Sequence, residues 1–305
     1  ELDPQFIQYL FKNYYFKEEY FRHGKGIHWD LWTTRWDQLK NIKFPIPSNK
    51  QQQIISRYLD KKTEQVDSLI DKIQKKIELL KEQRTSLINQ CVTKGLDPNV
   101  EMKDSGVEWI GEIPSHWDVK KFSYVSRLET GNTPSKTQED LYFTDDEDGF
   151  PWVKPSDLNV GVLGVSGTES RLTKEGKLES RVVPKDSILI CCIGNTSGKY
   201  SITNTELSIN QQINSITFDE TVMPRYGLFY MDVFGRDLLK WMNFVTLPII
   251  SKGDLSQQPI LVPPSKEQGS ISDYLDQQME IYLSIVTKEN RRVQLLSEYR
   301  QSLIS

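Results

Sequence analysis

The sequence predicts an α+β protein in which a mixed, mainly β domain lies between two long helices that pair as an antiparallel coiled coil. Two observations lead to this prediction. A helical segment at residues 47–88 occurs again, in register and without a gap, at residues 263–304. The residues between the copies have the short apolar runs and turn signals of strands. Because the repeat interval is far longer than a solenoid period, the chain is modular and uses one kind of helix twice.

Composition restricts the class of protein. The chain has 305 residues, 37% of them hydrophobic and 26% charged, and a net charge of −4. It lacks the run of about 18 apolar residues that a membrane span needs, and it opens without a signal-peptide pattern, so we expect a cytoplasmic protein. Cys91, Cys191 and Cys192 form neither a disulfide framework nor a spaced metal site, so no bound metal is expected. The net charge excludes DNA binding by bulk electrostatics alone.

Residues 1–46 are predicted to be the C-terminal remnant of a first domain that resembles the later β domain. Residues 4–10 repeat the proline and aromatic spacing of residues 224–230, and residues 44–46 resemble the apolar run at 260–262. The chain is therefore expected to open partway through that first domain.

Residues 47–97 contain the first long helix, predicted from about Gln51 to Lys94. Gly95, followed by Pro98, ends it. Apolar residues recur at heptad positions over several repeats, which is typical of a coiled coil. These predicted helix-pairing residues are Leu59, Val66, Ile70, Ile73, Ile77, Leu80 and Leu87. Such a helix would be about 65 Å long at 1.5 Å per residue, long enough to act as a spacer.

Residues 263–305 contain the second helix, which keeps the same apolar seam with Glu289 as the one strong interruption. Its predicted pairing residues are Leu275, Tyr282, Val286, Val293, Leu296 and Leu303. Packing of each helix against a separate core is the alternative. Because the seam occurs twice, antiparallel pairing of the two copies is favoured.

Residues 98–262 are predicted to form the β domain. Apolar runs bounded by Gly, Pro, Asn and Asp indicate strands at 119–128, 150–153, 160–165, 182–183, 187–193, 213–218 and 260–262. Aromatic residues at helical spacing predict one helix at 224–245.

Six motifs in order resemble those of the specificity subunit of type I restriction-modification systems. One is the step Lys266–Gln268 that leads into Tyr274–Asp276 and the heptad helix. The others are GVEWIGEIPSHWDVKKF at 106–122, TGNTPS at 130–135, PWVKPSDL at 151–158, GNTSGK at 194–199 and INQQI at 209–213. The resemblance covers nearly the whole chain and departs from the family at the front, where most of a first target recognition domain is missing.

This resemblance implies a DNA-binding function without catalysis by the chain itself. In that family each target recognition domain reads one half of a split double-stranded DNA sequence. The paired helices fix the distance between the halves and dock methyltransferase (M) subunits. The resemblance implies no cofactor on this chain, with S-adenosylmethionine, ATP and magnesium on partner subunits, namely the M subunit and the restriction (R) subunit. A self-dimer is a further expected possibility.

Polar loop residues are the candidates for DNA contact. Asn or Gln can pair with adenine and Arg or Lys with guanine, while hydroxyl groups and lysines also bind phosphates. The candidate DNA-binding residues are Asn132, Thr133, Ser135, Lys136, Lys154, Ser156, Asn195, Thr196, Lys199, Ser251 and Lys252. Asp157, Asn210, Gln211 and Gln212 lie in the same loops, and the two glutamines are favoured as structural because they open a strand. For every candidate the alternative role is a turn residue that hydrogen-bonds its own backbone.

Two other functions are considered. Asp157, Glu175 and Lys177 have the order of residues found in metal-dependent nucleases, although the wider motif is absent. A coiled-coil scaffold whose β domain binds protein or glycan is the second alternative. Magnesium-dependent cleavage by the chain alone would favour the nuclease, whereas co-purification with a methyltransferase would favour the specificity subunit.

Overall fold

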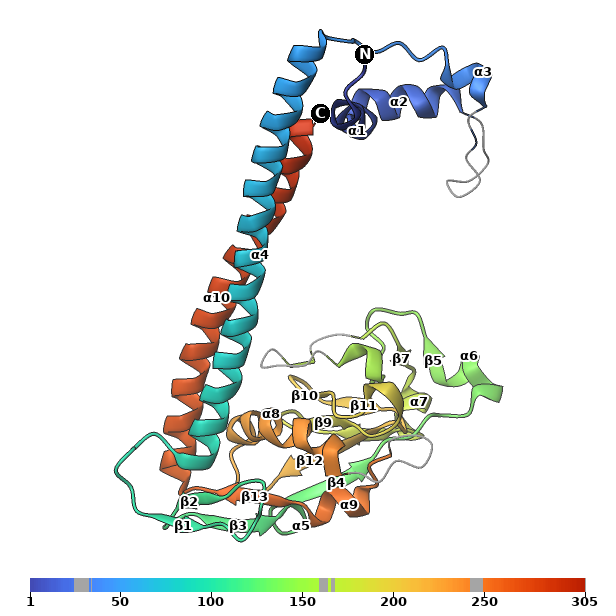
Figure 1. Cartoon of the computed structure of the whole chain (residues 1–305). Coiled ribbons are helices and arrows are strands. Elements are labelled where there is room, and N and C mark those ends of the chain that lie inside the picture. The colour runs from blue at the N-terminus through green and yellow to red at the C-terminus, as the bar shows by residue number, and fades with distance from the viewer. Residues whose placement is uncertain (25–32, 34, 159–163, 166–167, 242–248, 305) are drawn as a thin grey trace. The chain divides into compact units, whose positions relative to one another are not determined.

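The computed structural model describes residues 1–24, 33, 35–158, 164–165, 168–241 and 249–304. They form two compact units (Figure 1). Unit 1 comprises Glu1–Lys81 and Leu283–Ser305, and unit 2 comprises Glu82–Tyr282. Helices and strands are both abundant, which confirms the predicted α+β class. No helix in the described part of the chain is long and apolar enough to cross a membrane.

The two repeated segments form helix α4 (Asn49–Lys94), of 46 residues, and helix α10 (Ser265–Ile304), of 40 residues. Within unit 1 they are antiparallel, because Asp67 accepts a hydrogen bond from Arg300 and Lys76 donates one to Glu289, each at 2.6 Å. Within unit 2 the Arg84 guanidinium of α4 lies 5.9 Å from the centroid of the Tyr282 ring of α10. Each unit therefore contains part of the predicted antiparallel pair.

The predicted pairing residues are buried or half-buried. Val66 and Ile73 are buried in unit 1, and Leu275 is buried in unit 2. The other predicted pairing residues are half-buried: Leu59, Ile70, Ile77, Leu80, Leu87, Tyr282, Val286, Val293, Leu296 and Leu303. Leu79 and Leu295, which lie outside the seam, are exposed.

Glu289 interrupts the apolar seam as an ion-paired residue. Its side chain is buried beside Lys76, and Arg292 donates to it at 3.0 Å. The hydrogen bond from Lys76 lowers the pKa of the Glu289 carboxyl, opposed by desolvation and assisted by the charge of Arg292. The carboxyl is therefore held in its charged form, which explains how an acid is accommodated in the seam.

Unit 1 also contains helices α1 (Pro4–Lys12), α2 (Tyr14–His23) and α3 (Trp36–Leu39). Asp3 caps α1 by accepting from the Phe6 amide at 2.9 Å. The Tyr9 hydroxyl donates to Asp60 of α4 at 2.7 Å, and Asn13 donates to the Ile304 carbonyl of α10 at 2.9 Å. The short helices are thereby fastened to both long helices.

Unit 2 contains the sheets (Figure 1). The four-stranded sheet has the order β10 (Tyr200–Ile202), β9 (Ile188–Cys191), β12 (Ile213–Phe218) and β4 (Ser126–Thr130). The five-stranded sheet has the order β5 (Phe143–Thr144), β7 (Arg171–Leu172), β6 (Phe150–Val153), β11 (Leu207–Ile209) and β8 (Arg181–Val183). Two small sheets pair β1 (Met102–Asp104) with β2 (Glu112–Pro114), and β3 (Asp118–Lys121) with β13 (Pro259–Val262). The helices outside the long pair are α5 (Phe122–Val125), α6 (Glu139–Tyr142), α7 (Lys174–Leu178), α8 (Pro224–Trp241) and α9 (Lys252–Gln257).

The four-stranded sheet is the middle layer of unit 2. Along β9, Ile188 and Ile190 join the core shared with α8, whereas Leu189 and Cys191 join the core shared with the five-stranded sheet. Successive strand residues point to opposite faces, so a strand covered on both sides is apolar throughout. This explains the uninterrupted apolar run that predicted a strand at 187–193.

Several predicted elements are found and others differ. Strands 150–153 and 213–218 have the predicted bounds, whereas 119–128 is split by α5 because Phe122 and Val125 turn into the core. Residues 44–46, which resemble β13 in sequence, are not a strand in the described structure. β13 is a strand because it pairs with β3. Residues 160–163 and 242–245, predicted as parts of a strand and a helix, lie outside the described residues.

A buried glutamine fastens the start of each long helix. Gln268 accepts from the Met223 amide at 2.7 Å and donates to the Thr221 and Pro263 carbonyls, both at 2.9 Å. Its side chain is buried, so these bonds are shielded from water. These bonds give Gln268 of the Lys266–Gln268 motif a structural role.

The same arrangement occurs in unit 1. Gln52 accepts from the Asp3 amide at 2.7 Å and donates to the Pro47 carbonyl at 2.8 Å. It also donates to the Glu1 carbonyl at 3.4 Å. Each unit therefore joins a short proline-initiated helix to the start of a long helix in the same way.

Charge placed in the seam should destabilise the helix pair. Ile73→Asp combined with Val293→Asp would bury unpaired carboxylates, and we expect a loss of about 3 kcal/mol or more in the free energy of unfolding. Urea unfolding followed by circular dichroism measures it. The matched control is Leu79→Asp with Leu295→Asp, both at exposed positions of the same helices. Equal stability of the two double variants would contradict the seam.

Loss of the glutamine side chain should loosen the junction in unit 2. In Gln268→Ala the Met223 amide and two carbonyls lose a buried partner, and we expect about 1–3 kcal/mol of destabilisation. Gln277→Ala, an exposed glutamine of the same helix, is the control. A thermal shift no larger for Gln268→Ala than for Gln277→Ala would show that the buried bonds contribute nothing.

Candidate nucleic-acid interface

Strand ends from both main sheets meet at one edge of unit 2. Strands β6 and β11 are parallel, so their carboxyl ends, Val153 and Ile209, lie side by side. The Asn210 amide donates to the Val153 carbonyl at 3.1 Å. The loops that follow these two strands therefore start from the same place.

The other sheet continues this edge. β11 leads through residues 210–212 into β12, whose Ile213 pairs with Cys191 at the end of β9. Asn214 of β12 pairs with Thr130 at the end of β4. The connections that leave β9 and β4 consequently lie beside those that leave β6 and β11.

A fifth segment joins through the backbone. The Ile250 amide donates to the Cys192 carbonyl at 2.9 Å, which brings Ser251 and Lys252 alongside. We call residues 131–135, 154–157, 192–199, 210–212 and 250–252 the loop edge. Loops distant in the sequence are thus gathered on one surface of unit 2.

Close backbone packing fixes the loop edge. A Cβ on Gly131 would lie 2.2 Å from the Asn210 carbonyl oxygen, so this position accepts only glycine without a shift. The Asn132 amide donates to the Ile209 carbonyl at 3.0 Å, and the Trp152 indole N–H donates to the Asn132 carbonyl at 3.2 Å. Gly131 and Trp152 lie in motifs noted in the sequence but were not candidate residues. Nothing local marks either as a positioning residue.

Several candidate residues use their polar groups in contacts within the protein. Asn132 donates to the Glu179 carbonyl at 2.6 Å, and the Thr133 hydroxyl donates to Gln211. The Thr196 hydroxyl lies 3.0 Å from the Cys191 sulfur. Ser251 is the N-cap of α9, where it accepts from the Asp254 amide at 3.0 Å. For these side chains a structural role is established, and a DNA contact stays a prediction.

Asn210 and Gln212 also take part in turn geometry. Asn210 is buried and accepts from the Gln212 amide at 2.9 Å, and the Gln212 carbonyl accepts from the Cys192 amide at 2.8 Å. Gln211, which holds Thr133, is exposed.

The lysines of the loop edge differ from these residues. Lys154, Lys199 and Lys252 form no ion pair with any carboxylate in the described part of the chain, and Lys252 is exposed. Ser135 and Ser156 are exposed as well. The side chains of Lys136 and Asn195 lie outside the described residues. In the part of the chain that the structure describes, the ammonium groups of Lys154, Lys199 and Lys252 thus have no carboxylate within ion-pair distance.

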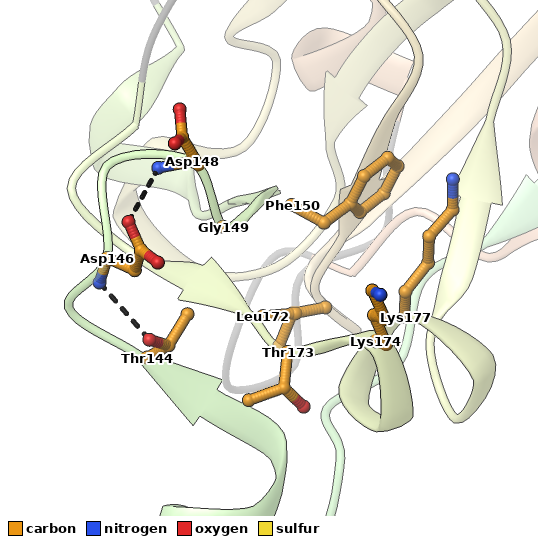
Figure 2. Close-up of a pocket in the computed structure, with 9 residues that line it drawn as sticks. All are labelled: Thr144, Asp146, Asp148, Gly149, Phe150, Leu172, Thr173, Lys174 and Lys177. Carbon is orange, nitrogen blue, oxygen red and sulfur yellow. Dashed lines mark hydrogen bonds between the residues drawn. The ribbon is translucent and has the colours of Figure 1, made fainter.

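The acidic run Asp145–Asp148 precedes β6 of the five-stranded sheet, at the end of that strand opposite the loop edge. Asp145–Asp148 connect β5 to the start of β6, whereas the loop edge follows the end of β6. A pocket of about 480 Å³ lies there. Asp146 and Asp148 line it on one side and Lys174 and Lys177 on the other (Figure 2). The Asp148 amide donates to Asp146 at 3.1 Å, so the run is an ordered turn. The acidic run and Lys154 thus lie at opposite ends of β6.

Two of the three residues of the nuclease alternative, Asp157 and Lys177, have structural partners. Asp157 accepts from the Lys154 amide at 2.8 Å and from the Thr168 hydroxyl at 3.1 Å. Lys177 donates to Glu206 at 2.8 Å, with its ammonium 3.9 Å from the centroid of the Phe150 ring. Glu175 is an exposed residue of α7. No group of three His, Cys, Asp or Glu side chains that could hold a metal ion occurs among the described residues.

The cysteines are free thiols in the interior. Burial raises the pKa of the Cys192 thiol to about 12 and that of the Cys91 thiol to about 11. Since the thiolate is the nucleophile, the raised pKa values favour the neutral thiol form of Cys91 and Cys192 at neutral pH.

Comparison with known proteins gives concordant results. Residues 114–295 match the family model of the type I restriction modification DNA specificity domain. The putative type I restriction enzyme MjaX specificity subunit of Methanocaldococcus jannaschii is 23% identical over 96% of this chain and 65% of its own length. The chain thus spans about two thirds of that relative.

Solved structures have the same fold. The HsdS subunit from Thermoanaerobacter tengcongensis matches 99% of this chain and 69% of its own, with 15% identity and a TM-score of 0.59. A chain from a structure concerning complex assembly and conformational transition of the type I restriction-modification system matches 99% of this chain and 70% of its own, with 18% identity and a TM-score of 0.71. The family model covers more than half of the sequence, and the chain therefore belongs to the family of type I restriction-modification DNA specificity subunits.

Proposed function

We propose that this chain directs a type I restriction-modification complex to DNA by reading one half of a bipartite target with the loop edge. In this proposal the paired helices α4 and α10 set the distance between the two half-sites and dock the M subunits. The observation that carries it is the loop edge itself, where strand ends from two sheets place polar loops and uncompensated lysines together.

The charge distribution supports an approach of DNA toward the loop edge. Phosphates repel the acidic run Asp145–Asp148 and attract Lys154, Lys199 and Lys252, so a duplex approaching unit 2 favours the loop edge. The net charge of −4 limits the attraction. We therefore expect weak, salt-sensitive binding by the chain alone and tighter binding once M subunits add phosphate contacts.

The bipartite target is supported by the repeat of the glutamine junctions. In unit 2, residues of α8 and α10 share a core with residues of the sheets. Met231 and Phe234 of α8 are 0% and 2% exposed there. The residues at the corresponding positions of unit 1, Phe11 and Tyr14, are 52% and 53% exposed. Ile46 of unit 1 is likewise exposed where Val262 of unit 2 is buried.

Unit 1 also has a groove of about 500 Å³. Apolar side chains of α1, α4 and α10 line it, among them Phe6, Leu10, Ile54 and Leu303. An apolar surface of this kind marks an interaction site. In the proposal it carries a second recognition domain of the same kind as that of unit 2, and a self-dimer is the alternative way to supply one.

The chemistry is assigned to partner subunits. The M subunit would bind S-adenosylmethionine and methylate adenine, and the R subunit would use ATP and magnesium. Asp157 and Lys177, two of the three residues of the nuclease alternative, have structural partners, which supports a non-catalytic role. The complex would act on cytoplasmic DNA.

Exchange of the recognition domain should change the DNA half-site. If residues 117–262 are replaced by the same segment of a family member with a different target, we expect a new methylated half-site with unchanged spacing, because the helices are untouched. Sequencing of methylated adenines in cells that carry the chain and its M partner measures this. As a control, the same chimaera with Ile73→Asp and Val293→Asp should not methylate. Retention of the original half-site would refute the assignment of unit 2.

The loop-edge lysines should account for part of the salt dependence. With Lys154, Lys199 and Lys252 all changed to Gln, we expect the slope of log K against log salt to fall by up to about 3, since each phosphate contact contributes about 0.9. Fluorescence anisotropy on target duplex measures the slope. The control is Lys103, Lys174 and Lys185 changed to Gln, three exposed lysines away from the loop edge. Equal slopes for both triple variants would place the DNA elsewhere.

A further inference from the structure

A buried carboxylate in α8 links a long helix to the loop that ends at Lys199. Asp232 is 4% exposed. Arg84 Nη2 of α4 donates to Asp232 Oδ1 at 3.0 Å, and the Tyr200 hydroxyl donates to the same oxygen. Tyr200 is the first residue of β10 and directly follows Lys199. One carboxylate therefore connects α4 with the end of a loop-edge segment.

Arg84 is a fixed point for this link. Its side chain is 17% exposed, and its guanidinium lies 5.9 Å from the centroid of the Tyr282 ring of α10. A largely desolvated guanidinium without a carboxylate partner is costly, so Arg84 and Asp232 hold one another in place. The Asp232 carboxylate is therefore connected to α4 through Arg84, and to α10 through the contact between Arg84 and Tyr282.

A second contact, independent of the ion pair, brings α8 against the same loop. Gly235 lies one helical turn after Asp232, on the same face. A Cβ on Gly235 would lie 3.4 Å from the Gly198 carbonyl oxygen and 3.4 Å from Cδ1 of Tyr200. At Gly235, helix α8 therefore lies next to Gly198 and Tyr200.

The loop is closed on itself and must move as one piece with Tyr200. The Cys191 amide donates to the Lys199 carbonyl at 2.7 Å, and the Gly198 amide donates to the Cys191 carbonyl at 2.9 Å. These bonds join the two ends of residues 192–199. A displacement of Tyr200 is therefore transmitted to Thr196 and Lys199.

We infer that Asp232 is a positioning residue for sequence recognition. It holds residues 194–199 in place through the Tyr200 hydroxyl, and its ion pair with Arg84 connects that loop to the helix pair. The inference rests on the proposed function, because it gives the held loop a role in reading DNA. Asp232 is buried, so its effect on recognition is indirect. Its removal should alter discrimination at the base pairs facing this loop and leave the others unchanged.

The test uses Tyr200→Phe in the full chain, which deletes one hydroxyl and keeps the Arg84–Asp232 pair. We expect backbone amides of residues 194–199 to exchange hydrogen about tenfold faster, since a hydrogen bond to a charged group is lost. We also expect about tenfold weaker discrimination at a subset of half-site positions. The matched control is Tyr230→Phe, which removes another buried hydroxyl of unit 2, one that donates to the Pro259 carbonyl at 2.9 Å.

A second pair of variants tests the carboxylate itself. Asp232→Asn weakens the link to Arg84 and should give a larger change of the same kind. Asp276→Asn is its control, because Arg225 of α8 donates to Asp276 at 2.9 Å without touching the loop edge. If Asp232→Asn does not fold, Tyr200→Phe still decides the question.

The outcomes separate the inference from the proposed function. Faster exchange together with position-dependent loss of discrimination in the methylation profile supports the inference. Unchanged exchange, or faster exchange with an unaltered profile, overturns it while the proposed function stands. A chain without substitutions that directs no sequence-specific methylation with its M partner overturns the proposed function, and the inference with it.

Discussion

The burial of the apolar seam shared by α4 and α10 is the constraint on which the rest of the structure depends. A helix of 46 residues with one apolar stripe cannot bury that stripe alone, and the second helix offers a matching one. Antiparallel pairing places the start of one helix beside the end of the other. Each unit thereby gains a helix start, where Gln52 or Gln268 fastens a short proline-initiated helix.

The loop edge follows from strand order. Because β6 and β11 are parallel, and β11 continues directly into β12 of the other sheet, the ends of β6, β9 and β4 are brought to one side. The acidic run at the start of β6 is then separated from the lysines that follow its end. A chain with net negative charge can in this way present a surface suited to an anionic ligand.

Several polar side chains of the loop edge form hydrogen bonds within the protein. Thr133, Thr196 and Ser251 hold neighbouring groups, and Asn132 donates across to the Glu179 carbonyl. Such bonds give loops a defined shape, which direct readout of base edges requires. The loop backbone is thus held by hydrogen bonds within the protein, and contact of the lysines with phosphates belongs to the proposed function.

The sequence by itself determined the two long helices, their pairing, the α+β class and the family, because heptad periodicity and repeated motifs are local signals that packing reinforces. It also located the loops, since Gly131 and its polar neighbours mark turns in any context. Only the tertiary structure decided that these loops share one edge, that the predicted strand at 119–128 breaks at α5, and that residues 44–46 form no strand in the described part. It alone brought Asp232, an acid within an apolar helical run, together with Arg84 and Tyr200, which are distant from it in sequence. Hydrogen bonds between remote segments depend on how the chain folds back on itself, which no local pattern encodes.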